Sequence, residues 1–390
     1  MSGSTLAQQA HSRPRRVLLL QCRNYGDAVI STGLVQALGS CEPQPELHVL
    51  TRPWLRSVFT TNPFVSRVHE AEFPMGTDKR FGTRAALRLT RQVAKLRRLH
   101  FDVVVHMTGD VREITLGRLI APKGNCGLLW EAGHPQRRIV RQAMERWVSM
   151  PVIIPPDELN IYSAAQRLAS FLGARTPALP RLYDPTGTPY VHRPVERAVG
   201  IHMLAGQRCR EWPPERWREL VKAIKKAGLD VVVFGAAADR ERLTASLGDT
   251  LDERVELVTG SLDNFFLRLS RVRAFVGLDS FSIHAARAIG APSIMLNGAS
   301  RAEIWTPPGT EFLDGGAGLA CHPCFNKPVC SSSASPYQCI RAIPEANVLR
   351  LLERLGAFSS RAAFGYAGAP ETDDRVIASP RPFLTRSHSP

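Results

Sequence analysis

The sequence predicts an α/β protein made of two doubly wound domains that face a central cleft. Short apolar runs alternate with longer amphipathic stretches through most of the 390 residues. Such alternation is typical of parallel sheets with crossover helices. A proline-rich interruption at residues 176–196 separates two halves of similar size, and the length fits two domains of about 150 residues each.

The first half contains three apolar runs that predict strands, at residues 17–20, 47–50 and 103–106. Amphipathic stretches near residues 28–38, 84–99 and 160–172 predict helices. We therefore expect an N-terminal domain over residues 14–175. The segment 176–196 holds five prolines and no sustained period, which indicates an interdomain linker.

The second half repeats the pattern from residue 197 onward. Apolar runs at residues 199–202, 231–234, 275–277 and 293–296 predict strands, and stretches near 214–227, 239–247 and 280–289 predict helices. These elements define a C-terminal domain over residues 197–357. Residues 358–390 are rich in Ser, Pro, Arg and Gly, a composition that predicts a disordered tail.

The formal net charge of +15 predicts an acidic partner, such as nucleic acid, an anionic membrane or a phosphorylated small molecule. No apolar run approaches the roughly 20 residues of a membrane-spanning helix, and the polar residues 1–13 do not resemble a signal peptide. These features predict a cytoplasmic location, with peripheral attachment to a membrane as the alternative.

The first strand leads into Asn24-Tyr25-Gly26-Asp27, directly before a helix. A phosphate-binding loop at this place would hold several glycines and no acid. Asp27 therefore has two interpretations. Its carboxylate caps the helix, or it projects toward a ligand and removes a proton as a general base.

In the second half, "GLDSFSIHAARAIG" places Asp279 and Ser280 between a strand and a helix, and His284 one turn further on the same face. Helix capping explains the first two residues. The alternative is that the helix N-terminus binds a diphosphate, since free amides and the helix dipole favour anions there.

Two further loops follow strands of the second half. Ala205 and Gly206 form a small-residue turn before Arg210, whose guanidinium can hold a diphosphate through paired hydrogen bonds. Asp239 follows Gly235 and can bind ribose hydroxyls or sit at the positive end of a helix. For Arg210, an ordinary solvated surface position is the alternative.

Taken together, "RNYGDAVISTGLVQAL", "GIHMLAGQRCREWPPERWREL" and "GLDSFSIHAARAIGAPSIMLNG" resemble glycosyltransferase family 9, the ADP-heptose heptosyltransferases of lipopolysaccharide core assembly. The resemblance extends from about residue 16 to residue 350. It implies a GT-B fold, with two Rossmann-like domains and the sugar nucleotide held mainly by the second. It also implies an inverting transfer with no obligatory divalent metal.

The resemblance assigns a role to each matched position. Asp27 matches the proposed general base, and Asp239 an acid that binds the nucleoside sugar. Asp279, Ser280 and His284 match the motif around the diphosphate and donor sugar. Three features depart from the family: Arg210 stands where a phosphate-binding Lys is usual, Phe281 stands where a Gly is frequent, and Asn297-Gly298-Ala299-Ser300 replaces a common Gly-Pro-Thr turn. These departures concern the donor rather than the fold.

The helix near residues 84–99 carries a continuous basic face made of Arg84, Arg88, Arg91, Lys95 and Arg98. Ala86, Leu89, Val93 and Leu96 are expected on the opposite, core-facing side. Such a face is most often simply solvated. Contact with an anionic glycolipid acceptor or with the inner face of an inner membrane is the functional alternative.

Four cysteines lie close together as C-x2-C-x5-C-x8-C: Cys321, Cys324, Cys330 and Cys339. In a cytoplasmic chain, four nearby thiols predict a structural zinc or iron site before a set of disulfides. Reduced, metal-free cysteines are the alternative. Similar clusters occur in a branch of the resembled family that binds iron and glycosylates protein Ser or Thr.

These observations predict a glycosyltransferase that moves heptose from ADP-heptose to a lipopolysaccharide core acceptor of the lipid A-Kdo type. A protein O-heptosyltransferase of the autotransporter type is the enzymatic alternative, for which the cysteines are the indication. A basic nucleic-acid-binding protein is the non-enzymatic alternative. We expect no nucleic-acid partner, because the sequence has no recognised binding module.

Overall fold

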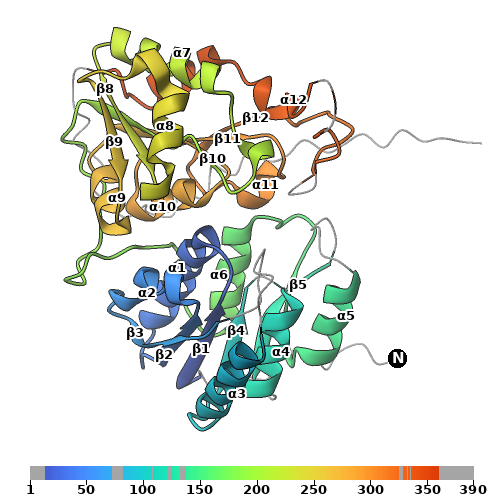
Figure 1. Cartoon of the computed structure of the whole chain (residues 1–390). Helices are drawn as coiled ribbons and strands as arrows, with labels where there is room; N and C mark the ends of the chain where they lie inside the picture. Colours follow the sequence, from blue (N-terminus) through green and yellow to red (C-terminus); the bar gives the residue numbers. More distant parts are fainter. Residues whose placement is uncertain are drawn as a thin grey trace, which may run out of the picture. The chain divides into compact units, whose positions relative to one another are not determined.

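The computed structural model describes residues 14–72, 82–107, 109–121, 124–131, 138–324, 328–331, 333 and 335–359. Within them, two six-stranded parallel sheets are each flanked by helices (Figure 1). The predicted tail at 358–390 falls almost entirely outside the described residues. The predicted bounds of the two domains and of the linker stay predictions.

The first sheet has the strand order β3-β2-β1-β4-β5-β6. Its strands are β1 (Arg16–Gln21), β2 (Glu46–Thr51), β3 (Val65–Glu70), β4 (Val103–His106), β5 (Asn125–Trp130) and β6 (Met150–Ile154). The helices of this half are α1 (Tyr25–Gly39), η1 (Pro53–Leu55), α2 (Ser57–Thr60), α3 (Thr83–Arg97), α4 (Val111–Ile120), α5 (Arg138–Trp147) and α6 (Ile161–Phe171).

The second sheet has the order β12-β11-β10-β7-β8-β9, the same topology as the first. Its strands are β7 (Ala198–Ile201), β8 (Asp230–Gly235), β9 (Val255–Thr259), β10 (Ala274–Leu278), β11 (Ser293–Asn297) and β12 (Glu311–Asp314). The helices here are η2 (Arg208–Arg210), α7 (Pro214–Lys226), η3 (Ala237–Asp239), α8 (Arg240–Leu247), η4 (Gly248–Thr250), α9 (Leu262–Leu269), α10 (Phe281–Ile289), α11 (Ala302–Trp305), α12 (Gln338–Arg341) and α13 (Glu345–Arg354).

Both strand orders reverse at one point, between β1 and β4 in the first sheet and between β7 and β10 in the second. In open parallel sheets, ligands bind beyond the carboxyl ends of the strands at this switch point. The fold therefore directs attention to the loops after these four strands. The prediction of two Rossmann-like, doubly wound domains is confirmed.

All seven predicted strands are present, and five strands were missed. Four of the missed strands, β3, β6, β9 and β12, form the edges of the two sheets. Edge strands face solvent in part, so charged residues interrupt their apolar pattern, as Arg67 and Glu70 do in β3. A search for continuous apolar runs passes over such strands.

The segment predicted as a linker packs along α1. The Thr32 hydroxyl accepts a hydrogen bond from the Arg181 amide at 3.1 Å, and the Tyr183 hydroxyl donates to Gln36 Oε1 at 2.9 Å. Gly33 has no room for a side chain, because a Cβ there would lie 2.3 Å from the carbonyl oxygen of Ala178. This connection is therefore part of the packed structure.

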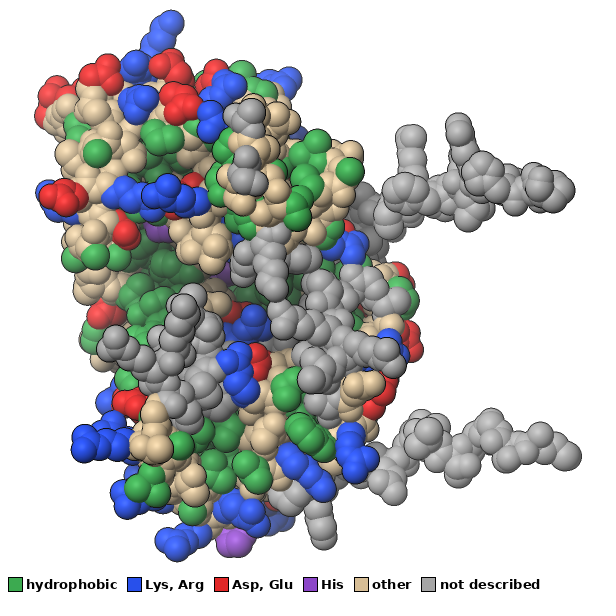
Figure 2. Space-filling view, turned by 45° about the vertical axis from the view of Figure 1, so that its right-hand side comes forward, with side chains coloured by type: hydrophobic (Ala, Val, Ile, Leu, Met, Phe, Trp, Pro, Cys, Tyr) green, Lys and Arg blue, Asp and Glu red, His purple; other side chains and the backbone are tan. Residues whose placement is uncertain are grey.

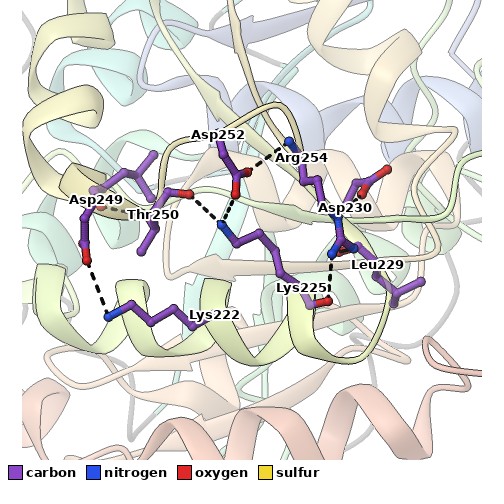
Figure 3. A network of polar contacts seen from close by, with 9 residues as sticks. Lys222, Lys225, Leu229, Asp230, Asp249, Thr250, Asp252 and Arg254 are labelled. Atoms are coloured by element: carbon purple, nitrogen blue, oxygen red, sulfur yellow. Dashed lines mark hydrogen bonds and ion pairs between the residues drawn. The ribbon is translucent and has the colours of Figure 1, made fainter.

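A network of charges supports the amino-terminal edge of the second sheet (Figure 3). Arg254 donates to the carbonyls of Lys225 and Leu229 and pairs with Asp230 at 2.9 Å. Lys225 pairs with Asp252 at 2.6 Å. The network joins the end of α7 to the starts of β8 and β9, so it lies at the edge opposite the carboxyl ends of the strands.

No helix of the described residues is long and apolar enough to cross a membrane.

Candidate active site

Asp27 occupies the third position of α1, directly beyond the carboxyl end of β1. Its Oδ2 accepts a hydrogen bond from the Asn24 amide at 3.3 Å, so the carboxylate does cap the helix. The side chain is nevertheless half-buried rather than enclosed. The negative charge of Asp27 is the main cause that raises the pKa of Arg23. Capping and a catalytic role are therefore compatible, because one carboxylate has several acceptor sites.

The sequence reasoning missed Glu113, a buried acid beside this loop. Glu113 belongs to the first turn of α4, after β4, and its Oε1 accepts the Cys22 amide at 3.1 Å. Burial and the charge of Glu113 together raise the pKa of the Cys22 thiol well above its usual value. In the sequence, Glu113 reads as an ordinary acid at a helix start. Only the adjacency of β1 and β4 brings it to the Asp27 loop.

In the second sheet, Arg210 and Asp279 meet across the switch point. Arg210 ends η2 after β7, and Asp279 directly follows β10. Arg210 Nη1 lies 3.4 Å from Asp279 Oδ2 and donates to the Asp279 carbonyl at 3.2 Å. The Asp279 carboxylate, 5% exposed, also accepts a hydrogen bond from the Ser300 hydroxyl. These contacts hold the guanidinium over the carboxyl end of the sheet.

Ser280 is the residue that precedes α10, yet its hydroxyl makes no capping hydrogen bond to that helix. It lies instead 3.0 Å from the hydroxyl of Ser282. Simple capping by Ser280 is thus not what the structure contains. The helix N-terminus next to Arg210 is a place where backbone amides and the helix dipole favour an anion.

The two halves meet where α1 approaches α10. A Cβ on Gly26 would lie 3.1 Å from His284 Cδ2, and the rings of Tyr25 and Phe281 are 5.6 Å apart. His284 Nδ1 bonds to the Tyr162 hydroxyl of α6 at 2.8 Å. Asp27, one residue after Gly26, therefore lies beside the residues of the Asp279–His284 segment.

His284 is uncharged at neutral pH in this environment. Burial lowers its pKa from 6.5 to about 4, although the nearby charges of Asp279 and Asp27 act in the opposite direction. The Tyr162 hydroxyl fixes the orientation of the ring. His284 can therefore position groups by neutral hydrogen bonding and packing, and it does not supply a positive charge to a phosphate.

The remaining candidate residues of the second half follow β7 and β8. Asp239 Oδ2 accepts the Ala236 amide at 3.0 Å, which repeats the local capping seen at Asp27. The Ala205 amide donates to Glu211 Oε1 at 3.2 Å. Gly206 is exposed, and no described atom lies within 4 Å of the place that a Cβ would occupy there. Glu211, which the sequence reasoning missed, thus fixes the turn before Arg210.

The predicted basic face is exposed along α3 and at Arg98, the residue after it; its members are Arg84, Arg88, Arg91, Lys95 and Arg98. Ala86, however, is exposed, and the buried positions are Ala85 and Leu96. The prediction for Ala86 was wrong because the apolar stripe is shifted by one residue at the start of the helix. Arg88 pairs with Glu72 at 3.1 Å, so part of the positive charge is balanced locally.

A pocket of about 340 Å³ lies between α3 and the end of β3. It is lined by Pro53, Glu70, Ala71, Glu72, Arg88, Leu89, Arg91, Gln92 and Lys95. Charged side chains of both signs are among them, and Arg88 and Glu72 pair with each other. On the face shown in Figure 2, Lys and Arg side chains are spread over many places and do not form a single patch.

The four clustered cysteines are free thiols, and their exposure differs. Cys321 is exposed, Cys324 and Cys330 are half-buried, and Cys339 is buried with its Sγ against Gly298. Among the described residues, no three His, Cys, Asp or Glu side chains are grouped so that they could hold a metal ion. The arrangement described here does not fit a bound metal, and the predicted zinc or iron stays a prediction.

Comparisons with known proteins identify relatives of this chain. The family model described as glycosyltransferase family 9 (heptosyltransferase) matches residues 89–333. The chain belongs to glycosyltransferase family 9. It is therefore a glycosyltransferase, and the prediction that it is an enzyme is confirmed. A lipopolysaccharide heptosyltransferase 1 of Pseudomonas aeruginosa is 22% identical over 316 residues, which cover 80% of this chain and 86% of that protein.

Two solved structures show the fold that the family 9 chain shares. The Escherichia coli heptosyltransferase WaaC with ADP superposes with a TM-score of 0.65 at 15% identity, covering 87% of this chain and 99% of that one. The iron-containing dodecameric glycosyltransferase TibC from enterotoxigenic E. coli gives a TM-score of 0.52 at 14% identity, covering 88% and 76%. The GT-B architecture predicted from the resemblance is confirmed.

Proposed function

We propose that this family 9 enzyme transfers heptose from ADP-heptose to a lipopolysaccharide core acceptor, with inversion at the anomeric carbon. The observation that supports this most is the approach of α1 to α10, which brings Asp27 beside the Asp279–His284 segment. A base on one domain and a diphosphate-binding helix end on the other are the two parts that a direct displacement needs.

In this proposal, the Asp27 carboxylate accepts the proton of the acceptor hydroxyl as its oxygen attacks the anomeric carbon. The bond between that carbon and the diphosphate oxygen breaks, and ADP leaves with the electron pair. Arg210 and the N-terminus of α10 stabilise the negative charge of the leaving diphosphate. Attack opposite to the leaving group accounts for inversion.

On the donor side, Ala205 and Gly206 allow the backbone to approach the diphosphate closely, and Asp239 binds ribose hydroxyls. The contact of Arg210 with Asp279, the residue before Ser280, supports a diphosphate site at this end of the sheet. ADP is the proposed nucleotide because relatives of this chain are named as ADP-heptose enzymes or were solved with ADP.

On the acceptor side, the basic face of α3 binds phosphates of the glycolipid or the anionic surface of the inner membrane. The pocket beside α3 offers such groups the side chains of Arg88, Arg91 and Lys95, together with those of Glu70 and Glu72. Contact with a membrane would place the enzyme peripherally at its cytoplasmic side.

Protein Ser or Thr is the second candidate acceptor. The cysteine-rich segment and the shared fold with the iron-containing TibC favour it. The two candidates separate in a turnover assay with ADP-heptose, in which either a lipid A-Kdo acceptor or an autotransporter passenger protein is offered. Transfer to one and not to the other decides between them.

Isothermal titration tests the donor site directly. ADP, GDP, UDP and ADP-heptose are titrated into the wild type, Arg210→Ala and Asp27→Ala. We expect ADP and ADP-heptose to bind, Arg210→Ala to weaken both, and Asp27→Ala to leave ADP binding intact. If no adenine nucleotide binds, the proposed donor is wrong. If Arg210→Ala binds ADP as the wild type does, the proposed diphosphate site is wrong.

A further inference from the structure

His322, inside the cysteine-rich segment, is hydrogen-bonded to the turn that follows β11. Its Nε2 lies 2.8 Å from the carbonyl oxygen of Ser300. Since a carbonyl only accepts, Nε2 must carry the hydrogen. The amide of Cys324 donates to the neighbouring carbonyl of Ala299 at 3.1 Å. Two consecutive carbonyls of this turn are therefore held by one segment from 20 or more residues further along the chain.

The imidazole of His322 is closely packed against its neighbours. A Cβ on Gly316 would approach its Cδ2 to 2.3 Å and the Gly298 carbonyl oxygen to 2.5 Å, so only glycine leaves room for the ring. The ring nitrogen is 3.9 Å from Asp314 Oδ2, and the side chain is only 14% exposed. This enclosure keeps the ring of His322, and with it the hydrogen bond from Nε2, in a single orientation.

Ser300 connects His322 to the proposed donor site through hydrogen bonds. Its own hydroxyl donates to Asp279 Oδ2, and the same carboxylate oxygen lies 3.4 Å from Arg210 Nη1. Ser300 is completely buried. The second hydrogen bond to its carbonyl comes from Asn297 of β11 itself, at 2.7 Å. The contacts thus run from Arg210 through Asp279 to Ser300, and His322 extends them to the cysteine-rich segment.

We propose that His322 is a positioning residue for donor binding, which acts through Ser300 on the Asp279–Arg210 pair. The inference rests on the proposed function, because it takes this pair as the diphosphate site. His322 itself touches neither nucleotide nor reacting atoms. Its loss lets Ser300 turn away from Asp279, so that the carboxylate no longer holds the guanidinium in the direction that a diphosphate requires.

The test compares His322→Ala and His322→Gln in ADP titration and in turnover with ADP-heptose. For one hydrogen bond of ordinary strength, we expect His322→Ala to weaken ADP binding by about three- to tenfold. KM for ADP-heptose should rise by a similar factor, with kcat within about twofold of the wild type. The amide of Gln can donate where Nε2 does, so His322→Gln should recover most of the affinity.

His192→Ala is the matched control. His192 Nε2 likewise bonds to a backbone carbonyl, that of Val272, at 2.9 Å, and the residue is also half-buried. This variant loses the same kind of contact outside the donor site, so ADP binding should stay unchanged. An equal loss of ADP affinity in His192→Ala and His322→Ala would mean general destabilisation and would overturn the inference.

Ser300→Ala keeps the test decisive if His322→Ala does not fold. It removes the hydroxyl in the middle of the chain of bonds, and it should weaken ADP binding in the same way. Unchanged ADP affinity in either variant overturns the inference, as does a fall in kcat without a rise in KM. Arg210→Ala distinguishes failure of the proposed function from failure of this inference. If Arg210→Ala also leaves ADP binding unchanged, the proposed donor site is wrong. If Arg210→Ala alone weakens ADP binding, only the role of His322 is refuted.

Discussion

Replacing Asp27 by Asn separates the two roles that its carboxylate can have. As a cap, Asp27 accepts one hydrogen bond, from the Asn24 amide at 3.3 Å. The amide oxygen of Asn can still accept that bond, so what is lost is the negative charge, which interacts favourably with the helix N-terminus and with the guanidinium of Arg23. As a general base, by contrast, an amide cannot accept the proton at all.

The two effects differ greatly in size. Loss of the charge at the start of α1 should lower the free energy of unfolding by about 0.3–1 kcal/mol. Loss of general base catalysis should lower kcat by about 10²- to 10⁴-fold, which corresponds to roughly 3–5 kcal/mol of transition-state stabilisation. Binding of ADP should not change, since Asp27 contacts the acceptor in our proposal.

Urea unfolding, ADP titration and turnover with ADP-heptose measure the three quantities on the same preparations. Ser261→Ala is a suitable control, because the Ser261 hydroxyl caps α9 by accepting the Asn264 amide at 3.2 Å. It should lower the free energy of unfolding by about 1 kcal/mol with kcat unchanged. If Asp27→Asn retains kcat within about threefold of the wild type, Asp27 is a cap and the proposed base is wrong.

Four further outcomes follow from the structure. Tyr162→Phe leaves His284 Nδ1 buried without its hydrogen-bond partner and should lower the free energy of unfolding in urea by about 1–3 kcal/mol; no change would contradict the contact. Arg254→Ala removes three hydrogen bonds of the Figure 3 network and should lower the thermal midpoint while the Kd for ADP stays constant, so a weakened Kd would refute its separation from the donor site. Arg91→Glu should reduce cosedimentation with phosphatidylglycerol vesicles and not with phosphatidylcholine vesicles, and equal binding to both would argue against an anionic surface. Burial lowers the pKa of His106 and of His284 to about 4, so between pH 6.5 and 4 the unfolded chain binds more protons than the folded one. The free energy of unfolding should therefore fall on acidification, by at most about 1.4 kcal/mol per pH unit for each histidine. A free energy of unfolding that stays constant over this range in urea titrations would contradict this.

The sequence predicted the buried strands well because these strands are apolar along their whole length. Strands with both faces covered need no alternation, so β1, β4, β8 and β10 appear as continuous hydrophobic runs. The predicted start of helix α1, near residue 28, is three residues too late. The first turn, Tyr25-Gly26-Asp27, holds a glycine and an acid, so the apolar pattern of the helix begins only after it.

The sequence also placed Asp27, Arg210, Asp239 and Asp279 shortly after the ends of strands, and the structure has them there: Asp27 in the first turn of α1, Arg210 in η2, Asp239 in η3 and Asp279 directly after β10. This was possible because the end of a strand and the start of a helix are local signals. Whether these residues bind the donor or act on the acceptor is still a proposal. Sequence alone left capping open at Asp27 and Ser280, and the structure answers differently at each: the first caps, and the second does not.

The contacts between distant segments were decided only by the tertiary structure. Nothing in the chain before or after Glu113 marks it as a neighbour of Cys22, because β1 and β4 pair across 80 or more residues. The same holds for Tyr162 and His284, and for His322 and Ser300, whose partners lie on other elements. A sequence determines which segments become strands and helices through local patterns of polarity. Which side chains then share a site depends on the order of strands in the two sheets, and that order results from packing over the whole chain.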